Sequence, residues 1–443
     1  MALGLGFKGG ILGFGEEATN EYGTAVARTK FVEMTSDGLG VEEERIESAT
    51  LNAIYSDEDN VKRGTVAVSG DVETEMRYEG AEVLLKHALG QCASSTEQAS
   101  FTVVGTGTGE NDNIDFKEDA GTELHATVAA GSYIMGESGA TDATLCKAIK
   151  TGLEAAGAGT YTVTFSNTTK KITIAVSGAK SAVQFLWKTG TSGSDNTDLH
   201  IGTLIGFSDN ADSTSEASHT GDSAIITVFK HIFKLTDSLP TGLTFEADRD
   251  TYGFVVEGGK INTLGLSTEV NGFLKMALGI IGEDMTTGSV TEATLPTAPL
   301  ISFDDIVITY SGSQDVKTME VSLNNNLKTD RYYLNSRLIK EPERSARIEV
   351  TGSITIEFNA ITEYDLFRAA TSGALVATAT GATIKTGYAY EMVITLGQIK
   401  LTGGVPKIAD VGIIPLELPF KAYAADSSNR EMVITLTNTI SSV

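Results

Sequence analysis

The stretch TVAVSGDVETEMRY, residues 65–78, alternates apolar and polar side chains along its length. Val66, Val68, Val72 and Met76 fall on one side of an extended chain, and charged or hydroxylated residues occupy most of the other side. Because successive side chains of a β-strand point to opposite faces, this pattern predicts a long strand with one buried face and one face in water.

A second stretch, RIEVTGSITIEF at 347–358, repeats this pattern. When Gly70 is aligned with Gly352, Val68 meets Val350 and Val72 meets Ile354. A slip of one residue would exchange the two faces, so the alignment is well determined. The residues that follow, EGAEVLLKHALG (79–90) and ITEYDLFRAATS (361–372), carry apolar side chains at helical spacing. Each copy is therefore predicted to continue from its strand into a short amphipathic helix.

A third pair of segments, GGKINTLGL (258–266) and VPKIADVGI (405–413), aligns Lys260 with Lys407 and, further on, Phe273 with Phe420. Strand, helix and Lys-Ile element recur in the same order, which predicts a duplicated unit. The distance from the first element to the last is much longer in the first copy, and polar stretches near 91–113 and 208–224 resemble linkers. We therefore predict a first domain at 1–98 and 227–298, an inserted domain at 99–226 and a second domain at 299–443.

The predicted fold class is mainly β (α+β), with two tandem β-sandwich or barrel domains that each carry one short helix. The insert is predicted to be a small α+β domain with strands at 114–116, 124–128, 160–165, 170–176 and 183–187. Its helix is expected at 142–157, with Asp142 as N-cap and Gly157 as the stop signal.

The charge balance excludes one class of function. A formal net charge of −25 on 443 residues predicts a soluble chain that repels nucleic acid, so a phosphate-gripping role is not expected. Repulsion would nevertheless suit a protein past which DNA must move without sticking. The sequence contains no run of 18 apolar residues, so no membrane span is predicted. The glycine-dense start lacks the basic leader of a signal peptide.

Motifs of catalysis and metal binding are missing from the sequence. Cys92 and Cys146 form no CxxC pair, the five histidines form no HxH or HExxH motif, and neither GxSxG nor a Walker motif occurs. No enzyme activity, cofactor or metal is therefore expected. The glycine-rich start at 1–15 is interpreted as an arm, and the acidic run EEER at 42–45 as a solvated loop.

Four segments resemble one known family: GFKGGILGFGEEATNEYGTAV (6–26), TKFVEMTSDGLGVEEERIES (29–48), GTVAVSGDVETEMRYEGAEVLLKHALG (64–90) and IPLELPFKAYAADSSNREMVITLTN (414–438). They are similar to the tail tube proteins of long-tailed (siphovirus-type) bacteriophages. The similarity covers most of 1–98 and 227–443. The insert resembles a module found inside other phage tail proteins, to which we assign no activity.

This resemblance implies packed β-sheets with one flanking helix, and subunits whose long strands join into a continuous inner barrel. Most members use six single-domain subunits per ring, so a duplicated chain implies stacked trimeric, pseudo-hexameric rings. The implied role is that of the major tail tube subunit, the conduit for DNA ejection. Implied partners are other copies of the chain, the tape measure and terminator proteins, and passing DNA without specific binding, with no membrane. The implied location is the virion tail, after assembly in the host cytoplasm.

The polar faces of the two repeated strands supply the candidate lumen-facing residues. These are Asp71, Glu73, Glu75, Arg77, Arg347, Glu349, Ser353, Thr355 and Glu357. A lumen lined by them would be mixed in charge but net negative, which favours sliding of DNA. The alternative is that the same faces meet the outer solvent.

Three other functions remain open at this stage. A tail-associated or cell-surface adhesin with tandem β-domains would bind a ligand without stacking end to end. A distal tail adaptor sharing the tube fold would cap the tube instead of repeating along it. A carboxylate-based glycosidase would need two acidic residues facing each other in one cleft.

Overall fold

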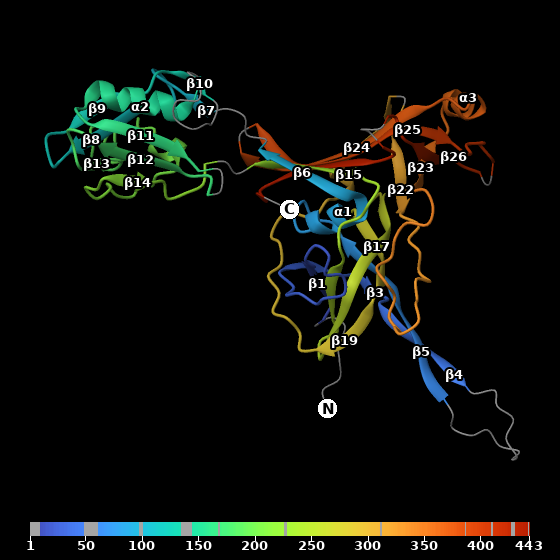
Figure 1. The fold of residues 1–443 in the computed structure, drawn as a ribbon. Coiled ribbons are helices and arrows are strands. Elements are labelled where there is room, and N and C mark those ends of the chain that lie inside the picture. The colour runs from blue at the N-terminus through green and yellow to red at the C-terminus, as the bar shows by residue number, and fades with distance from the viewer. Residues whose placement is uncertain are drawn as a thin grey trace, which may run out of the picture. The chain divides into compact units, whose positions relative to one another are not determined.

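The computed structural model describes residues 9–47, 61–96, 101–133, 144–166, 169–225, 228–310, 312–385, 387–408, 411–426, 430–441 and 443. The chain divides into two compact units, one formed by Met1–Ser95 with Lys230–Val443 and the other by Thr96–Phe229 (Figure 1). Antiparallel strands dominate the described residues, so the predicted mainly β class is confirmed.

The larger unit is built mostly from strands. In chain order its elements are β1 (Ile11–Glu16), β2 (Lys30–Glu33), β3 (Ser36–Asp37), β4 (Gly40–Glu47), β5 (Val61–Glu75), α1 (Glu82–Leu89), β6 (Gly90–Thr96), β15 (Phe229–Leu235), β16 (Leu243–Asp248), β17 (Gly253–Glu269), β18 (Lys275–Gly282), β19 (Asp284–Gly288), η2 (Phe303–Asp305), β20 (Ile306–Tyr310), β21 (Ser313–Gln314), β22 (Val316–Asn324), β23 (Glu349–Glu357), α3 (Thr362–Arg368), β24 (Gly373–Lys385), β25 (Tyr388–Leu401), β26 (Pro415–Tyr423) and β27 (Val433–Asn438).

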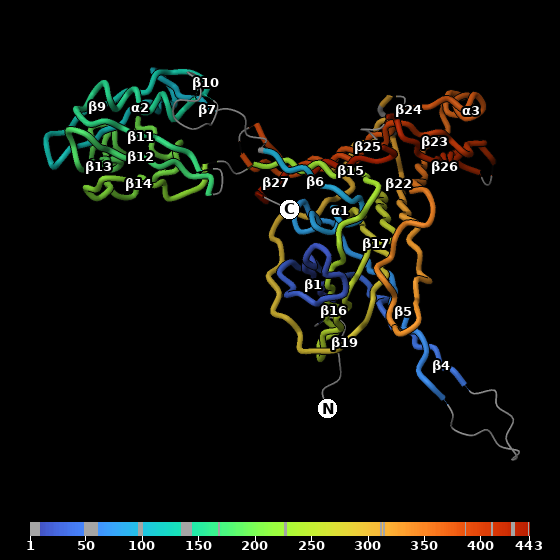
Figure 2. The backbone as a smooth tube through the Cα atoms, in the orientation of Figure 1, coloured from blue at the N-terminus to red at the C-terminus, as the bar shows by residue number. Residues whose placement is uncertain are grey.

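Six neighbouring strands, β5, β18, β17, β22, β23 and β26, run antiparallel across the middle of this unit, and we call them the central sheet. Their order carries the sheet from the first half of the chain into the second, because β17 pairs with β22. Figure 2 traces the same path along the backbone, with β4 and β5 extending as a hairpin beyond the rest of the unit.

Strand β17 belongs to two layers of the unit. Its first half pairs with β16 and β19, and its second half pairs with β18 and β22. The register against β18 shifts between Ile261 and Thr263, and such a bulge bends a strand and increases its twist. The two layers enclose one apolar core to which both halves of the chain contribute, as Val68, Leu266 and Ile354 illustrate.

The strand-and-helix repeat takes the same place in both halves. Gly70 of β5 lies opposite Ile280 of β18, and Gly352 of β23 lies opposite Phe420 of β26. Phe420 thus corresponds to Ile280 and not to Phe273, so the predicted alignment of 258–266 with 405–413 is wrong. The shared Lys-Ile letters misled the alignment, since residues 258–266 lie within β17, whereas the described residues of 405–413 form no strand.

The helix that follows each repeated strand differs in burial. In α1 nearly every side chain is buried, and the helix ends at Gly90, whose φ of 111° is the left-handed conformation that suits glycine at a C-cap. In α3 only Glu363 is buried. The helix of the first half is therefore part of the core, whereas that of the second half lies on the surface.

Two expectations about the N-terminal region are wrong. Within the predicted arm, residues 11–15 lie in β1, which pairs with both β2 and β16, and Leu12 and Phe14 are fully buried. The acidic run at 42–45 lies in strand β4 and not in a loop. The glycines at 13 and 15 weaken the strand signal of β1, which is why the sequence does not predict it.

The inserted unit has the α+β character predicted for it. Its elements are β7 (Phe101–Val103), β8 (Asn113–Glu118), β9 (Leu124–Thr127), β10 (Gly131–Tyr133), α2 (Leu145–Ala156), β11 (Thr160–Phe165), β12 (Ile172–Ser177), β13 (Val183–Phe185), η1 (Gly202–Ile205) and β14 (Ser218–Thr220). Asp142, the predicted N-cap, lies outside the described residues. Thr144 is the N-cap, because its side chain accepts a hydrogen bond from the backbone N–H of Lys147.

Candidate functional site

The face of the central sheet that points away from the core is the candidate functional surface, and we call it the wet face. One row across it, from β5 to β26, consists of Glu73, Ala277, Gly265, Ser322, Thr351 and Lys421. All six are exposed or half-buried, whereas the residues that alternate with them along the strands are largely buried. Three residues in the middle of this row, Ala277, Gly265 and Ser322, have small side chains or none.

Seven of the candidate lumen residues lie on the wet face. Asp71, Glu73 and Glu75 come from β5, and Glu349, Ser353, Thr355 and Glu357 come from β23. The other two candidates lie beyond the strand ends. Arg77 follows β5 and donates to the carbonyl of Ala298 and, at 2.7 Å, to Glu33, while Arg347 precedes β23.

The four remaining strands of the wet face were missed by the sequence reasoning. They add the acidic residues Glu269, Glu320 and Glu417. A signal was present in VKTMEVSLN (316–324) and LELPFKA (416–422), which alternate as clearly as the two recognised strands do. These residues share one surface only because their strands pair, and the sequence of a single segment does not reveal its pairing partner.

The electrostatics of the wet face are dominated by carboxylates. Its cations are partly neutralised, because Lys421 forms an ion pair with Glu349 and Lys317 lies 2.8 Å from Glu357. Among the ion pairs of the described residues, none includes Asp71, Glu73 or Glu320. The net charge presented by this surface is therefore negative.

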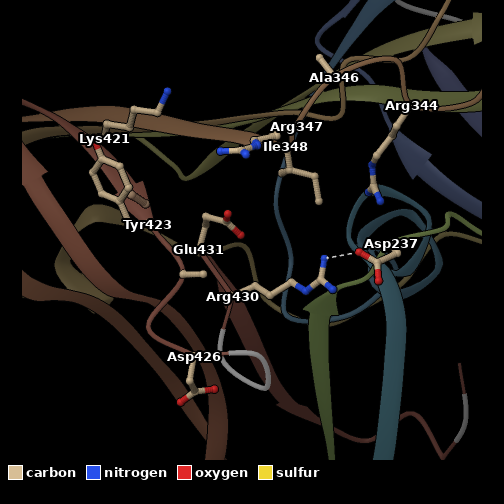
Figure 3. A pocket seen from close by; sticks show the side chains of 12 residues that line it. Asp237, Arg344, Ala346, Arg347, Ile348, Lys421, Tyr423, Asp426, Arg430 and Glu431 are labelled. Carbon is tan, nitrogen blue, oxygen red and sulfur yellow. Dashed lines mark ion pairs between the residues drawn. The ribbon is translucent and has the colours of Figure 1, made fainter.

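A separate pocket of about 760 Å³ lies at the end of the second half of the chain (Figure 3). Arg430 reaches 2.9 Å from Asp237, and Arg344 donates to the side-chain oxygen of Asn325 and to a backbone carbonyl. Arg347 also lines this pocket. Because Arg430 and Arg344 already have protein acceptors, the pocket is best explained as a structural junction of loops.

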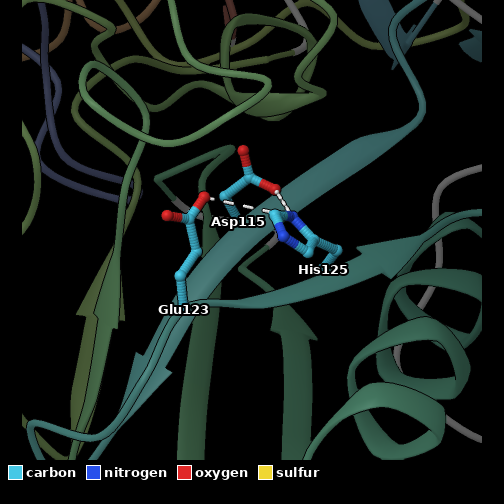
Figure 4. Close-up of side chains that lie close together, drawn as sticks. All are labelled: Asp115, Glu123 and His125. Atoms are coloured by element: carbon cyan, nitrogen blue, oxygen red, sulfur yellow. Dashed lines mark hydrogen bonds and ion pairs between the residues drawn. The ribbon is translucent and has the colours of Figure 1, made fainter.

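Three side chains that could hold a metal ion meet in the inserted unit (Figure 4). Asp115 is 1% exposed and accepts hydrogen bonds from Nδ1 of His125 at 2.7 Å and from the backbone N–H of Ser192. Glu123 accepts from the backbone N–H of Thr191. The carboxylates thus hold the 190–193 loop against β8 and β9, and an Nδ1 that donates a proton cannot also be a metal ligand.

A second group, Asp198, His200 and Asp209, also fits poorly to a metal. The Nδ1 atom of His200 accepts the backbone N–H of Gly202 at 3.0 Å. In a neutral imidazole the proton then sits on Nε2, the atom that lies 3.6 Å from Asp198. Burial lowers the pKa of His200, which favours this neutral form.

Where the β1–β2 connection meets β17 and β18, four acidic side chains come together. Burial, reinforced by Glu17, Glu257 and Asp284, raises the pKa of Glu283 to about 7. Glu17 is held by the backbone N–H groups of Gly23 and Gly258. This cluster therefore retains a proton near neutral pH.

We expect Glu283→Gln to raise the free energy of unfolding by about 1 kcal/mol at pH 8 and to leave it nearly unchanged at pH 4. The folded chain binds this proton more tightly than the unfolded chain, whose glutamate has its usual pKa of 4.5. Stability is thus lost as pH rises from 4.5 through 7, and glutamine removes that loss. Thermal unfolding at both pH values measures the effect, with exposed Glu292→Gln as control. Equal shifts for the two variants would contradict it.

A comparison with protein families explains the framework as a whole. The family model described as phage tail tube protein matches residues 8–422. The chain belongs to the phage tail tube protein family. It is thus a structural protein of the bacteriophage tail, a class that assembles with itself and with other tail proteins. No curated protein matches the chain.

The wet face is a broad sheet surface of small and acidic residues. It carries a hollow of about 260 Å³ that Glu269, Lys275 and Glu320 line among others. Within the described residues, no helix combines the length and apolar character needed to cross a bilayer.

Proposed function

We propose that this chain is the major tail tube subunit and that three copies close each ring of a stacked tube. The observation that carries this proposal is the continuous central sheet, in which two equivalent strand frameworks are joined through β17 and β22. Each chain then supplies two of the six equivalent units of a ring. In a ring closed by rotational symmetry, every sheet edge at a unit boundary is paired with the neighbouring unit.

Duplication of an ancestral unit accounts for this arrangement. We propose domains at 1–98 with 227–298 and at 299–443, with the insert at 99–226 decorating each ring three times. The matching registers of Gly70 and Gly352 support this. A further support is that both glycines lie against neighbouring backbone: a Cβ would come 2.2 Å from the carbonyl oxygen of Gly38, between β3 and β4, or of Glu320 in β22.

The wet face is proposed to line the bore, so that its acids face the passing genome. Phosphates would meet repulsion there, and the cations of β22 and β26 are held in ion pairs. In this role the tube conducts DNA during ejection without specific binding, catalysis or a cofactor. We propose the tape measure and terminator proteins as further partners, no contact with membrane, and assembly in the host cytoplasm.

Electron microscopy of the purified chain tests the ring directly. Negative stain should show hollow cylinders, and native mass spectrometry of short assemblies should show multiples of three chains. Isolated rings that never stack would favour a distal adaptor, and monomers with ligand affinity would favour an adhesin. Either result would overturn the proposal of a repeating tube subunit.

Reversing charge on the wet face should slow genome passage. We expect virions carrying Glu73→Lys with Glu320→Lys to release DNA more slowly, with a delay that shrinks as salt rises, because added cations bind phosphate. Both positions are exposed, so tube assembly and thermal stability should be nearly unchanged. The rate of DNA release from triggered virions measures the effect, and Glu292→Lys, outside the central sheet, is the matched control. An equal delay in the control would refute the proposed orientation.

A further inference from the structure

Within one chain, the junction between the two halves is a strand-to-strand contact. Residues 263–269 of β17 run antiparallel to residues 318–324 of β22, with Gly265 opposite Ser322 and Thr268 opposite Met319. One half of the chain thus supplies a strand that covers the edge of the other half. A tube made from equivalent halves needs the same contact between chains.

The first half carries a counterpart of β22 in β3 and β4. Val41 lies opposite Val68, as Leu323 lies opposite Val350, and Ser36 lies opposite Glu73. Since β5 and β23 correspond, the pair β3–β4 stands where β22 stands in the second half. Among the described strands, however, the registers of β3 and β4 are with β5 alone. Their outer edge is therefore the position that β17 covers in the other half.

The second half carries a counterpart of the covering strand. Leu401 lies opposite Phe420, as Ile261 lies opposite Ile280. At the other end, Ile414 accepts the backbone N–H of Phe358, as Leu274 accepts that of Met76. Residues 403–408 consequently stand in the place of 263–268.

These residues form no strand within the chain, although they carry apolar side chains into solvent. Val405 is 53% exposed and Ile408 is 83% exposed. Exposed apolar side chains such as these are typical of a surface that a partner covers. The position of 403–408 in the repeat identifies the kind of partner as a second copy of this chain.

We propose that residues 403–408 of one copy add as an antiparallel strand to the β3–β4 edge of the next copy, in the register of the β17–β22 junction. This inference rests on the proposed ring and specifies its contact. Val405 then lies opposite Gly40, and Ile408 lies opposite Asp37. A cavity of 390 Å³ beside β3, lined by Met34, Ser36, Asp37 and Arg249 among others, lies at the level of Ile408.

The chemistry at the middle of this register is complementary. Pro406 falls opposite Leu39 and has no N–H to donate to it. The carbonyl of Leu39 already accepts a hydrogen bond from Arg249 of its own chain at 2.6 Å. The arriving proline therefore leaves no acceptor unsatisfied. Lys407 falls opposite Gly38, next to Asp37, whose carboxylate already pairs with Arg249 of its own chain at 2.6 Å.

Disulfide trapping tests the register. In the double variant Gly40→Cys, Val405→Cys, the two cysteines would lie opposite each other on neighbouring strands. Opposite residues of an antiparallel pair have the Cα separation that a disulfide requires. A Cβ at Gly40 meets no atom within 4 Å, so the substitution is tolerated. Gly412→Cys with Gly40→Cys is the matched control, since Gly412 is equally open and would face Gly40 if 405–413 matched 258–266. The unsubstituted chain controls for Cys92 and Cys146.

Mild oxidation of assembled protein should convert the Gly40→Cys, Val405→Cys chain into a covalent trimer on a non-reducing gel, and the other two chains should remain monomeric. Trapping only through Gly412→Cys would overturn the register. Rings without trapping in either pair would overturn the strand addition while leaving the trimeric ring intact. Failure of the parent chain to form rings, together with no trapping, would overturn both proposals.

Discussion

Asn438→Ala should lower the free energy of unfolding of the larger unit by about 3 kcal/mol. Asn438 ends β27 with no exposed surface, and its side-chain N–H groups donate to the carbonyl of Tyr78 at 3.0 Å and to Glu82 at 2.7 Å. Its side-chain oxygen accepts the backbone N–H of Ile440. Alanine leaves these groups without their partner, and each unsatisfied group that is buried costs about 1–3 kcal/mol.

The size of this effect reflects what the asparagine connects. Glu82 belongs to α1 in the first half of the chain, and burial already raises its pKa. The amide from β27 is thus one of the polar contacts that hold the two halves as one unit. The control is Thr435→Ala, at a half-buried position on the same strand. In urea, the free energies of unfolding of Asn438→Ala and Thr435→Ala should differ by at least about 2 kcal/mol. Indistinguishable midpoints would contradict this account.

Local patterns in the sequence were sufficient to predict the strands and helices of the repeat. The alternation of Val66, Val68 and Val72 survives in the structure because the buried face of β5 meets a single apolar core. In the insert, the strand pattern at 160–165 and the stop at Gly157 are both confirmed. Each of these features depends on neighbours within a few residues.

Features that depend on pairing could not be predicted in the same way. The wet face combines residues from six strands, and nothing in the letters around Glu320 shows that β22 lies beside β17. The Lys-Ile match was wrong for a related reason. Residues 403–408 contain two glycines and a proline, which are unfavourable in strands. Their sequence therefore does not show the strand pattern of the corresponding part of β17.

The group of Asp115, Glu123 and His125 in the insert also depends on strand pairing. Asp115 and His125 lie on paired strands and meet only because β8 and β9 form a hairpin. Histidine spacing along the chain cannot reveal a pair that only strand register brings together. The structure then decides their role through the donors around them, which hold a loop in place.

Gly352→Ala should destabilise the larger unit by about 2–3 kcal/mol although it adds a single methyl group. The φ of Gly352 is not in the left-handed region, so the requirement for glycine is one of space. A Cβ there would lie 2.2 Å from the carbonyl oxygen of Glu320 and 2.6 Å from the ring of Phe420. The strands β22, β23 and β26 would have to separate, and overpacking of this kind typically costs 1–3 kcal/mol.

Gly265→Ala, in β17 of the same sheet, provides the matched control. Its added Cβ would come no closer than 3.5 Å to the Cβ of Ala277, an ordinary contact, so the change in stability should stay within about 1 kcal/mol and could be favourable. Gly70→Ala should behave like Gly352→Ala, since its Cβ would lie 2.2 Å from the carbonyl oxygen of Gly38. Thermal unfolding of the three variants therefore tests the equivalence of β5 and β23 directly. If Gly70→Ala and Gly352→Ala fell on opposite sides of the control, the two strands would not be playing the same part in their sheets.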